Sequence, residues 1–193
     1  MTETQLGPNT ESSASIHLEI SKVYALMKKT AEAYAEHSRA VEIYKQFENT
    51  DLISVAENAE NICELLQAEN ITGAIECISQ AIDIYDNSMG NDNKTSTKLR
   101  RKLSLLLLKS GKNNEAMDVL KQVEKSERVI FGEVSLKLFQ TYKLIAKVFE
   151  IMNNKSDAHA YYSKALDVAV KRKKPALSKE IRDKLRGINK GNE

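Results

Sequence analysis

The chain has 193 residues, a length that suits one domain with a sizeable core or an elongated array of small units. Only 2 prolines and 7 glycines interrupt a sequence rich in good helix formers, so we predict an all-α protein and exclude β-rich classes. The net charge is +2, yet residues 1–97 hold 6 Lys/Arg against 16 Asp/Glu, and residues 98–193 hold 23 against 11. The chain is therefore an electrostatic dipole along its sequence.

The first 14 residues are polar and acidic and lack the basic and apolar regions of a signal peptide. We therefore expect residues 1–14 to form a disordered arm and the protein to be cytoplasmic. The longest apolar run, Leu103 to Leu108, is far shorter than the roughly 20 residues of a membrane span, so no transmembrane segment is expected. Cys63 and Cys77 lack CxxC spacing, which favours buried thiols in a reducing compartment.

One pattern recurs four times along the chain. Alanines stand at intervals of 41, 42 and 42 residues, and each is followed after four residues by a larger side chain and after three more by a small one. Such a pattern predicts a helical hairpin in each unit, with the small residues where two helices approach closely. The members are Ala33, Ala74, Ala116 and Ala158; then His37, Ile78, Leu120 and Tyr162; then Ala40, Ala81, Val123 and Ala165.

The predicted domain organisation follows from this register. Residues 15–174 form four repeats, at about 15–48, 56–89, 97–130 and 139–172, whose hairpins turn near Lys29, Asn70, Asn113 and Asn154. A capping helix over residues 175–188 opens with Pro175, which is tolerated in the first turn of a helix, and residues 189–193 form a tail. Capping is expected because each hairpin buries one face only by stacking on a neighbour.

The small, large, small pattern resembles the tetratricopeptide repeat, and the 42-residue period, with Gly90 and Gly132 one period apart, is similar to the longer repeats of kinesin light chains. A second resemblance, carried by "GAIECISQAIDIYDNSMG", is to the soluble NSF attachment proteins. These resemblances imply a right-handed α-solenoid, and the first implies a cytoskeletal or ciliary setting. Tryptophan is absent, Ile62 replaces a small residue, and the turn glycine survives only as Gly111.

No group of residues predicts catalysis. His17, His37 and His159 are scattered without ligand spacing, and Gly111-Lys112 lacks the glycine and the Ser/Thr of a phosphate loop. We therefore expect a protein that is not an enzyme and that uses no cofactor, metal or small-molecule substrate.

The first helix of each repeat is expected to line a groove that binds an acidic or amphipathic peptide or helix of a protein partner. The groove would pass from an apolar floor to a basic end, where Lys and Arg attract carboxylates. The candidate residues are Leu18, Lys22, Ala59, Cys63, Leu66, Lys98, Arg101, Leu105, Lys143 and Lys147.

The main hypothesis is thus a non-catalytic adaptor or scaffold, and two alternatives stay open. One is a vesicle-fusion cofactor of the attachment-protein type that grips an acidic helical bundle. The other is a solenoid that binds nucleic acid through its basic half, including Lys171 to Lys174, although no aromatic residues are interleaved there to stack on bases. The opposite charges of the two halves also predict salt-sensitive self-association.

Overall fold

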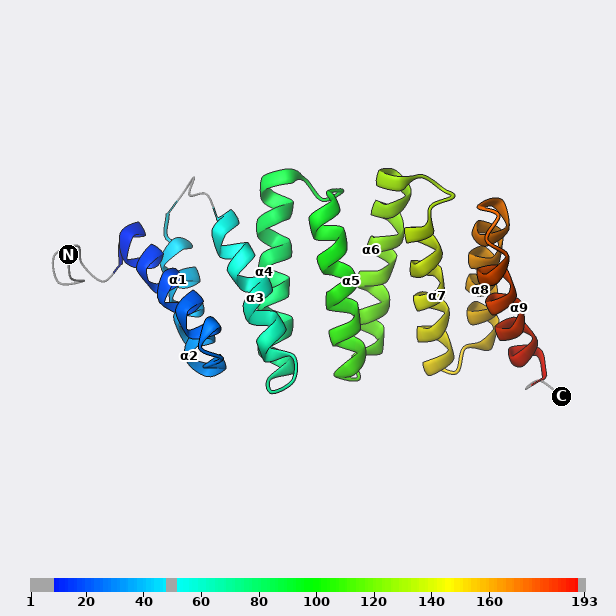
Figure 1. The fold of residues 1–193 in the computed structure, drawn as a ribbon, viewed down its shortest axis with the longest axis horizontal. Coiled ribbons are helices and arrows are strands. Elements are labelled where there is room, and N and C mark those ends of the chain that lie inside the picture. Colours follow the sequence, from blue (N-terminus) through cyan, green and yellow to red (C-terminus); the bar gives the residue numbers. More distant parts are fainter. Residues whose placement is uncertain (1–8, 48–51, 191–193) are drawn as a thin grey trace. The chain divides into compact units, whose positions relative to one another are not determined.

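The computed structural model describes residues 9–47 and 52–190, and within these ranges all regular structure is α-helical (Figure 1). The chain divides into two compact units, unit 1 (residues 1–90) and unit 2 (residues 91–193). Unit 1 contains α1 (Glu11–Leu26), α2 (Thr30–Tyr44), α3 (Ile53–Leu66) and α4 (Ile71–Met89). Unit 2 contains α5 (Lys94–Lys109), α6 (Asn113–Phe131), α7 (Leu136–Ile151), α8 (Lys155–Lys171) and α9 (Pro175–Lys190). The predicted all-α fold of tandem helical hairpins is confirmed.

The repeat register is what holds each hairpin together. Ala33, Ala74, Ala116 and Ala158 are completely buried, and so are the small residues seven positions later, Ala40, Ala81, Val123 and Ala165. The large residues between them are buried too, with Tyr162 at 3% exposure. Small side chains let the paired helices approach, and the large side chain fills the space that remains.

Unit 2 has a continuous core. Side chains of α6, α7 and α8, among them Leu120, Ile145 and Tyr162, form one buried cluster. Helix α9 covers this cluster with Ile181, which is completely buried, and with Leu177, Leu185 and Ile188 at helical spacing. Within unit 2, α9 therefore shields part of this cluster from solvent.

Three hairpin turns contain a residue in the left-handed region, at the position that glycine occupies in the third hairpin. Gly111 has φ 78°, and Lys28 and Asn153, at equivalent places in their repeats, have φ 56° and 57°. Glycine and asparagine adopt this conformation more easily than lysine, which carries a Cβ penalty there. The turn geometry thus persists where its favoured residue is lost.

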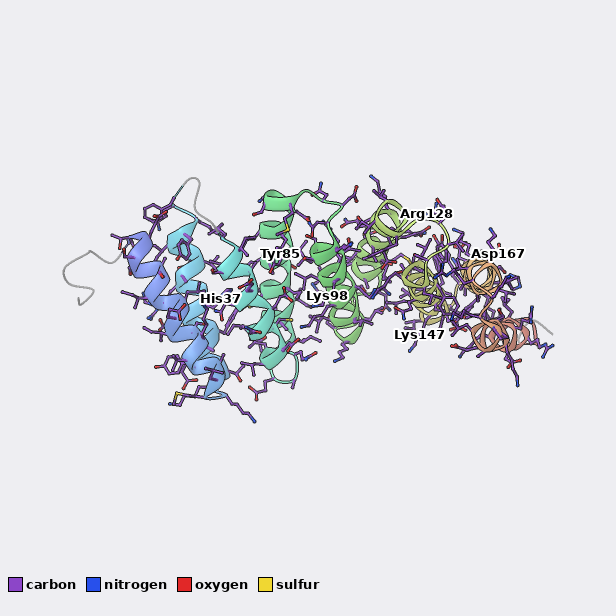
Figure 2. The ribbon with its side chains drawn as sticks, turned by 45° about the horizontal axis from the view of Figure 1, so that its top comes forward. His37, Tyr85, Lys98, Arg128, Lys147 and Asp167 are labelled. Atoms are coloured by element: carbon purple, nitrogen blue, oxygen red, sulfur yellow. The ribbon has the colours of Figure 1, made fainter. Side chains whose placement is uncertain are left out.

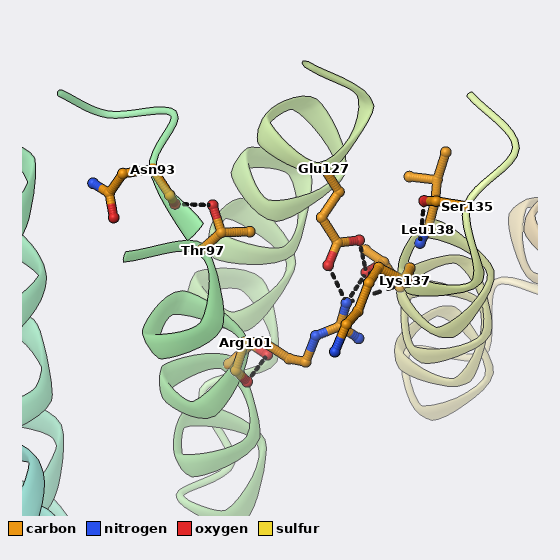
Figure 3. A network of polar contacts seen from close by, with 9 residues as sticks. Asn93, Thr97, Arg101, Glu127, Ser135, Lys137 and Leu138 are labelled. Atoms are coloured by element: carbon orange, nitrogen blue, oxygen red, sulfur yellow. Dashed lines mark hydrogen bonds and ion pairs between the residues drawn. The ribbon is translucent and has the colours of Figure 1, made fainter. Parts of the chain in front are cut away.

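The connections between hairpins in unit 2 begin from matching caps. Asn93 and Ser135, one period apart, accept hydrogen bonds from the backbone N–H groups of Ser96 (2.7 Å) and Leu138 (3.1 Å), as Figure 3 shows for Ser135. Each side chain satisfies an amide that has no partner inside the helix. These caps set the starting points of α5 and α7, the helices that carry most of the candidate site.

The helix ends differ from the expected boundaries by a few residues. Helix α1 begins at Glu11, inside the arm predicted for residues 1–14, because Thr10 caps it by accepting from the Ser13 N–H. Helix α9 continues to Lys190, past the predicted end at residue 188. Residues 1–8 of the arm and 191–193 of the tail lie outside the described residues.

Candidate partner-binding surface

Four of the predicted groove residues lie in the core. Leu18, Ala59, Cys63 and Leu66 are each no more than 3% exposed, so they present no surface to a partner. Their interpretation as groove lining is corrected: Leu18 shares the buried side of α1 with Ala14 and Ser21, and the other three lie on the buried side of α3. These four residues are therefore part of the core and do not form the floor of a groove.

The fifth candidate in unit 1, Lys22, is half-buried on α1, and its ammonium donates to Glu19 Oε1 at 2.6 Å one turn earlier. The first helices of unit 1 are otherwise acidic. Helices α1 and α3 together hold five Glu and this one Lys. The net charge of α1 and α3 is therefore opposite in sign to the charge that we predicted for the basic end of the groove.

A basic stripe runs along α5 in unit 2. Lys94, Lys98, Lys102 and Lys109 follow one another at helical spacing, with Leu105 between the last two, and α5 contains no acidic residue. Lys94, Lys98 and Lys109 are exposed, Lys102 is half-buried, and Leu105 is exposed (Lys98 is labelled in Figure 2). We call Lys94, Lys98, Lys102 and Lys109 the basic stripe.

Helix α7 adds more positive charge to unit 2. Lys137 and Lys147 are exposed, and Lys147 is labelled in Figure 2. Lys143 forms an ion pair with Glu180 of α9, so it ties the cap to the hairpin. Together α5 and α7 hold nine Lys/Arg against one acid, Glu150.

Arg101 has a structural role instead of the predicted contact with a partner carboxylate. Its guanidinium forms an ion pair with Glu127 of α6, donates to Thr141 Oγ1 of α7 at 2.5 Å and donates to the Lys137 carbonyl at 3.3 Å (Figure 3). Thr141 in turn donates to Glu127 Oε2 at 2.6 Å. We call Arg101, Glu127 and Thr141 the Arg101 cluster.

Glu127 and Thr141 are buried, so Arg101 already has a carboxylate partner inside unit 2. The Arg101 cluster joins three helices, α5, α6 and α7. It therefore fixes the helices that carry the basic stripe and Lys147, without itself being offered to a partner.

The second helices of unit 2 carry a cluster that the sequence analysis did not single out. Tyr161 of α8 accepts from Lys121 and donates to Glu124 Oε2 at 3.2 Å, and the ammonium of Lys164 lies 4.1 Å from its ring centroid. Burial, with the nearby Glu124 carboxylate, raises the pKa of Tyr161. The phenol thus stays protonated, and the Nζ atom of Lys121 also lies over its ring, 4.4 Å from the centroid. No spacing within one helix signals this cluster, because its members come from two helices.

Within the described ranges, no group of three or more His, Cys, Asp or Glu could hold a metal ion, and no helix is long and apolar enough to cross a membrane. Cys63 and Cys77 are buried free thiols. Burial, with Cys63 nearby, raises the pKa of Cys77 to about 12, which leaves it a protonated and unreactive thiol at neutral pH.

The sequence of residues 2–129, more than half of the chain, matches the family described as soluble NSF attachment protein, SNAP. The chain belongs to the soluble NSF attachment protein family. This confirms the second of the two resemblances, and the fourth hairpin and α9 of this family member lie outside the matched residues. No curated protein sequence matches the chain.

Solved structures share the fold of this SNAP family member at low sequence identity. BtubC (BKLC) from P. vanneervenii has a TM-score of 0.59 at 10% identity, over 94% of this chain and 81% of that one. A putative kinesin light chain of nearly identical TPR-like repeats from Podosopora anserina has a TM-score of 0.52 at 12% identity, over 95% and 98%.

The Rap conjugation gene regulator of plasmid pLS20, solved with the Phr* peptide, has a TM-score of 0.54 at 17% identity. The match covers 93% of this chain and 48% of that one. All three neighbours support the tetratricopeptide-like resemblance at the level of fold.

Proposed function

We propose that this SNAP family member is a non-catalytic adaptor that binds an acidic helical partner through the basic stripe of α5 and the exposed Lys137 and Lys147 of α7. The observation that carries the proposal is the charge of these two helices, nine Lys/Arg against a single acid. Such a surface attracts carboxylates, since its own two helices offer Glu150 as their single acid.

The spacing of the basic stripe suits a helical partner. Its lysines are four, four and seven residues apart, so they lie on one side of α5 over four turns. Acidic residues at similar spacing along a partner helix can meet them in register. Leu105, exposed between Lys102 and Lys109, adds an apolar contact to this surface.

Family membership favours a bundle of helices over an extended peptide as the partner. The attachment-protein hypothesis from the sequence included an acidic helical bundle, and the family match supports that hypothesis more directly than the fold of a kinesin light chain at 12% identity supports a cytoskeletal or ciliary setting. The family name also makes NSF a candidate partner. The peptide in the Rap structure keeps peptide binding as the competing possibility.

A designed four-helix bundle with an acidic surface provides the direct test. We expect it to bind the wild-type protein with an association rate that falls as salt rises, because steering by exposed charges is screened. A matched bundle with its surface acids replaced by Gln should bind at least tenfold more weakly. Fluorescence anisotropy and stopped-flow measurements give the affinity and the rate.

The decisive variant reverses the basic stripe, with Lys94, Lys98, Lys102 and Lys109 changed to Glu. It should lose binding to the acidic bundle, while the same number of reversals at Lys171, Arg172, Lys173 and Lys174 leaves binding nearly unchanged. If the stripe variant binds as wild type does, the proposed surface is wrong. If the second variant alone loses binding, the turn before α9 is the functional element.

A further inference from the structure

Unit 1 contains a groove of about 440 Å³ between α1 and α3. Ala25, Leu26 and Leu65 supply apolar walls, and Asn58, Asn61 and Glu64 supply polar atoms. Lys22 also lines the groove, and its ammonium is paired with Glu19 at 2.6 Å. We call this the α1–α3 groove.

Asn58 is a buried side chain with one unused polar atom. Its Nδ2 donates to Ser21 Oγ at 3.0 Å and lies 3.3 Å from His37 Nδ1, so the amide nitrogen is directed at α1 and α2. Its Oδ1 is buried and accepts no hydrogen bond from the residues that the structure describes. A buried carbonyl oxygen of this kind favours a ligand that brings an N–H donor.

The charge of unit 1 selects a cationic donor. Residues 1–90 hold 5 Lys/Arg against 15 Asp/Glu, a net charge of −10, and Glu64 is exposed at the groove. A lysine or arginine side chain combines an aliphatic stem, which suits the walls formed by Ala25, Leu26 and Leu65, with terminal N–H groups for Asn58 and Glu64. A carboxylate or phosphate would be repelled by the net charge of unit 1 and would find no donor at Asn58 Oδ1, and the cation in the groove lining, Lys22, already has Glu19 as its partner.

The same chain carries the complementary group. Residues 91–193 hold 24 Lys/Arg against 12 Asp/Glu, a net charge of +12. Four consecutive cations, Lys171 to Lys174, are all exposed at the turn between α8 and α9, where Lys173 adopts a left-handed φ of 51°. We call Lys171–Lys174 the basic turn. It presents several N–H donors from a short segment anchored by a helix on either side.

We propose that the basic turn of a second copy of this chain inserts a lysine or arginine side chain into the α1–α3 groove. The contact joins two different surfaces, so it is heterologous, and each copy offers one groove and one turn. Because one small contact is involved, the association is weak and concentration-dependent, and its dependence on salt follows from the opposite charges.

Complementary variants test this arrangement with the full chain. A groove variant carries Asn61→Ala and Glu64→Lys, both at exposed positions, and a turn variant carries Glu at positions 171 to 174. Sedimentation velocity at low salt should show wild type self-associating and each variant alone as a monomer. An equimolar mixture of the two variants should form a one-to-one dimer, because one intact turn can still meet one intact groove.

Two further variants separate the groove from general charge effects. Asn58→Leu removes the unused acceptor and should weaken self-association at least tenfold, with circular dichroism confirming that the helices remain. Glu42→Lys makes the same charge change as Glu64→Lys at an exposed position of α2, outside the groove, and should leave assembly close to wild type.

Several outcomes would overturn the proposal: a monomeric wild type at low salt, a mixture of the two variants that stays monomeric, or a Glu42→Lys effect as large as that of Glu64→Lys. A wild-type monomer that nonetheless binds an arginine-containing peptide in the groove would show that the cation comes from another protein. The turn variant keeps the basic stripe, so its binding to the acidic bundle reports on the proposed function separately.

Discussion

Units 1 and 2 are built from the same helical hairpin but present opposite charges on their first helices. Helices α1 and α3 hold five Glu and one Lys, whereas α5 and α7 hold nine Lys/Arg and one Glu. The buried alanines of both units follow one register. The difference teaches that packing constrains only the buried side of each hairpin, so the exposed side can take either sign and determines which partner is attracted.

The units also differ in the polar groups that they bury. Unit 1 places neutral groups together, Ser21, His37 and Asn58, whereas unit 2 buries the charged Arg101 cluster. In unit 1 the Ser21 hydroxyl donates to the Ala33 carbonyl at 2.8 Å, which links α1 to α2. These two kinds of buried contact respond differently to mutation and to pH, and both responses can be measured.

The largest expected effect is on unit 2. Changing Glu127 to Ala leaves the Arg101 guanidinium without its buried carboxylate, and we expect the free energy of unfolding of unit 2 to fall by about 3 kcal/mol. Urea unfolding followed by circular dichroism measures it. The double variant Arg101→Met with Glu127→Leu should recover most of the loss, because it removes both charges together. An unchanged midpoint for Glu127→Ala would contradict the structural role of the Arg101 cluster.

A comparable effect in unit 1 depends on pH. Burial lowers the pKa of His37 to about 4, partly opposed by the Gln80 side chain, so the unfolded chain binds a proton at higher pH than the folded one. Stability from neutral His37 is therefore complete above about pH 6.5 and falls by up to about 3 kcal/mol as the pH drops to 4. His37→Leu, which follows Leu120 in the register, should lose this component of the pH dependence. Equal slopes for both proteins between pH 6.5 and 4 would contradict it.

Overpacking the repeat register should cost less. Replacing Ala116 with Leu puts three more carbons where the two helices of the third hairpin meet, and we expect a loss of about 1–3 kcal/mol. Thermal unfolding gives the magnitude. Ala160, which is exposed on α8, provides the matched control, since Ala160→Leu should change the melting temperature little. A tolerated Ala116→Leu would mean that the helices do not meet closely there.

The smallest expected effect on stability comes from reversing the basic stripe. Exposed charges contribute little to folding, so the four changes to Glu should alter the melting temperature by no more than a few degrees. The same variant is expected to lose binding to the acidic bundle. A large loss of stability would instead assign the stripe a structural role in unit 2. The charge difference between the first helices of the two units would then contribute to folding instead of partner recognition.

Much of the fold could be predicted from the sequence because the buried pattern is local and repeated. The spacing of Ala33, Ala74, Ala116 and Ala158 was enough to place four hairpins and their turns, and Tyr162 is the core residue that the register predicted. The Tyr162 hydroxyl donates to Glu150 at 2.9 Å, a contact of the fourth hairpin that the repeat pattern does not specify. Periodicity predicts which residues are buried, but it does not choose their polar partners.

The candidate site was less predictable. The exposed Lys98 and Lys147 could be assigned to the surface from charge alone, and they remain part of the proposed site. Spacing alone could not show that Leu18 and Cys63 are buried. It indicates which residues share a face of a helix, but it does not indicate whether that face packs against a neighbouring helix or lines a groove.

The sequence by itself determined the helical hairpins, their number, the turns between them and the opposite charges of the two halves, since each depends on residues close together along the chain. Only the tertiary structure decided that Arg101 is taken by Glu127 and Thr141, that Asn58 keeps an unused oxygen at the α1–α3 groove, and that Lys121 and Lys164 meet on Tyr161. Each of these contacts joins residues from different helices. Their distances follow from how the helices pack, which no local pattern of side chains specifies.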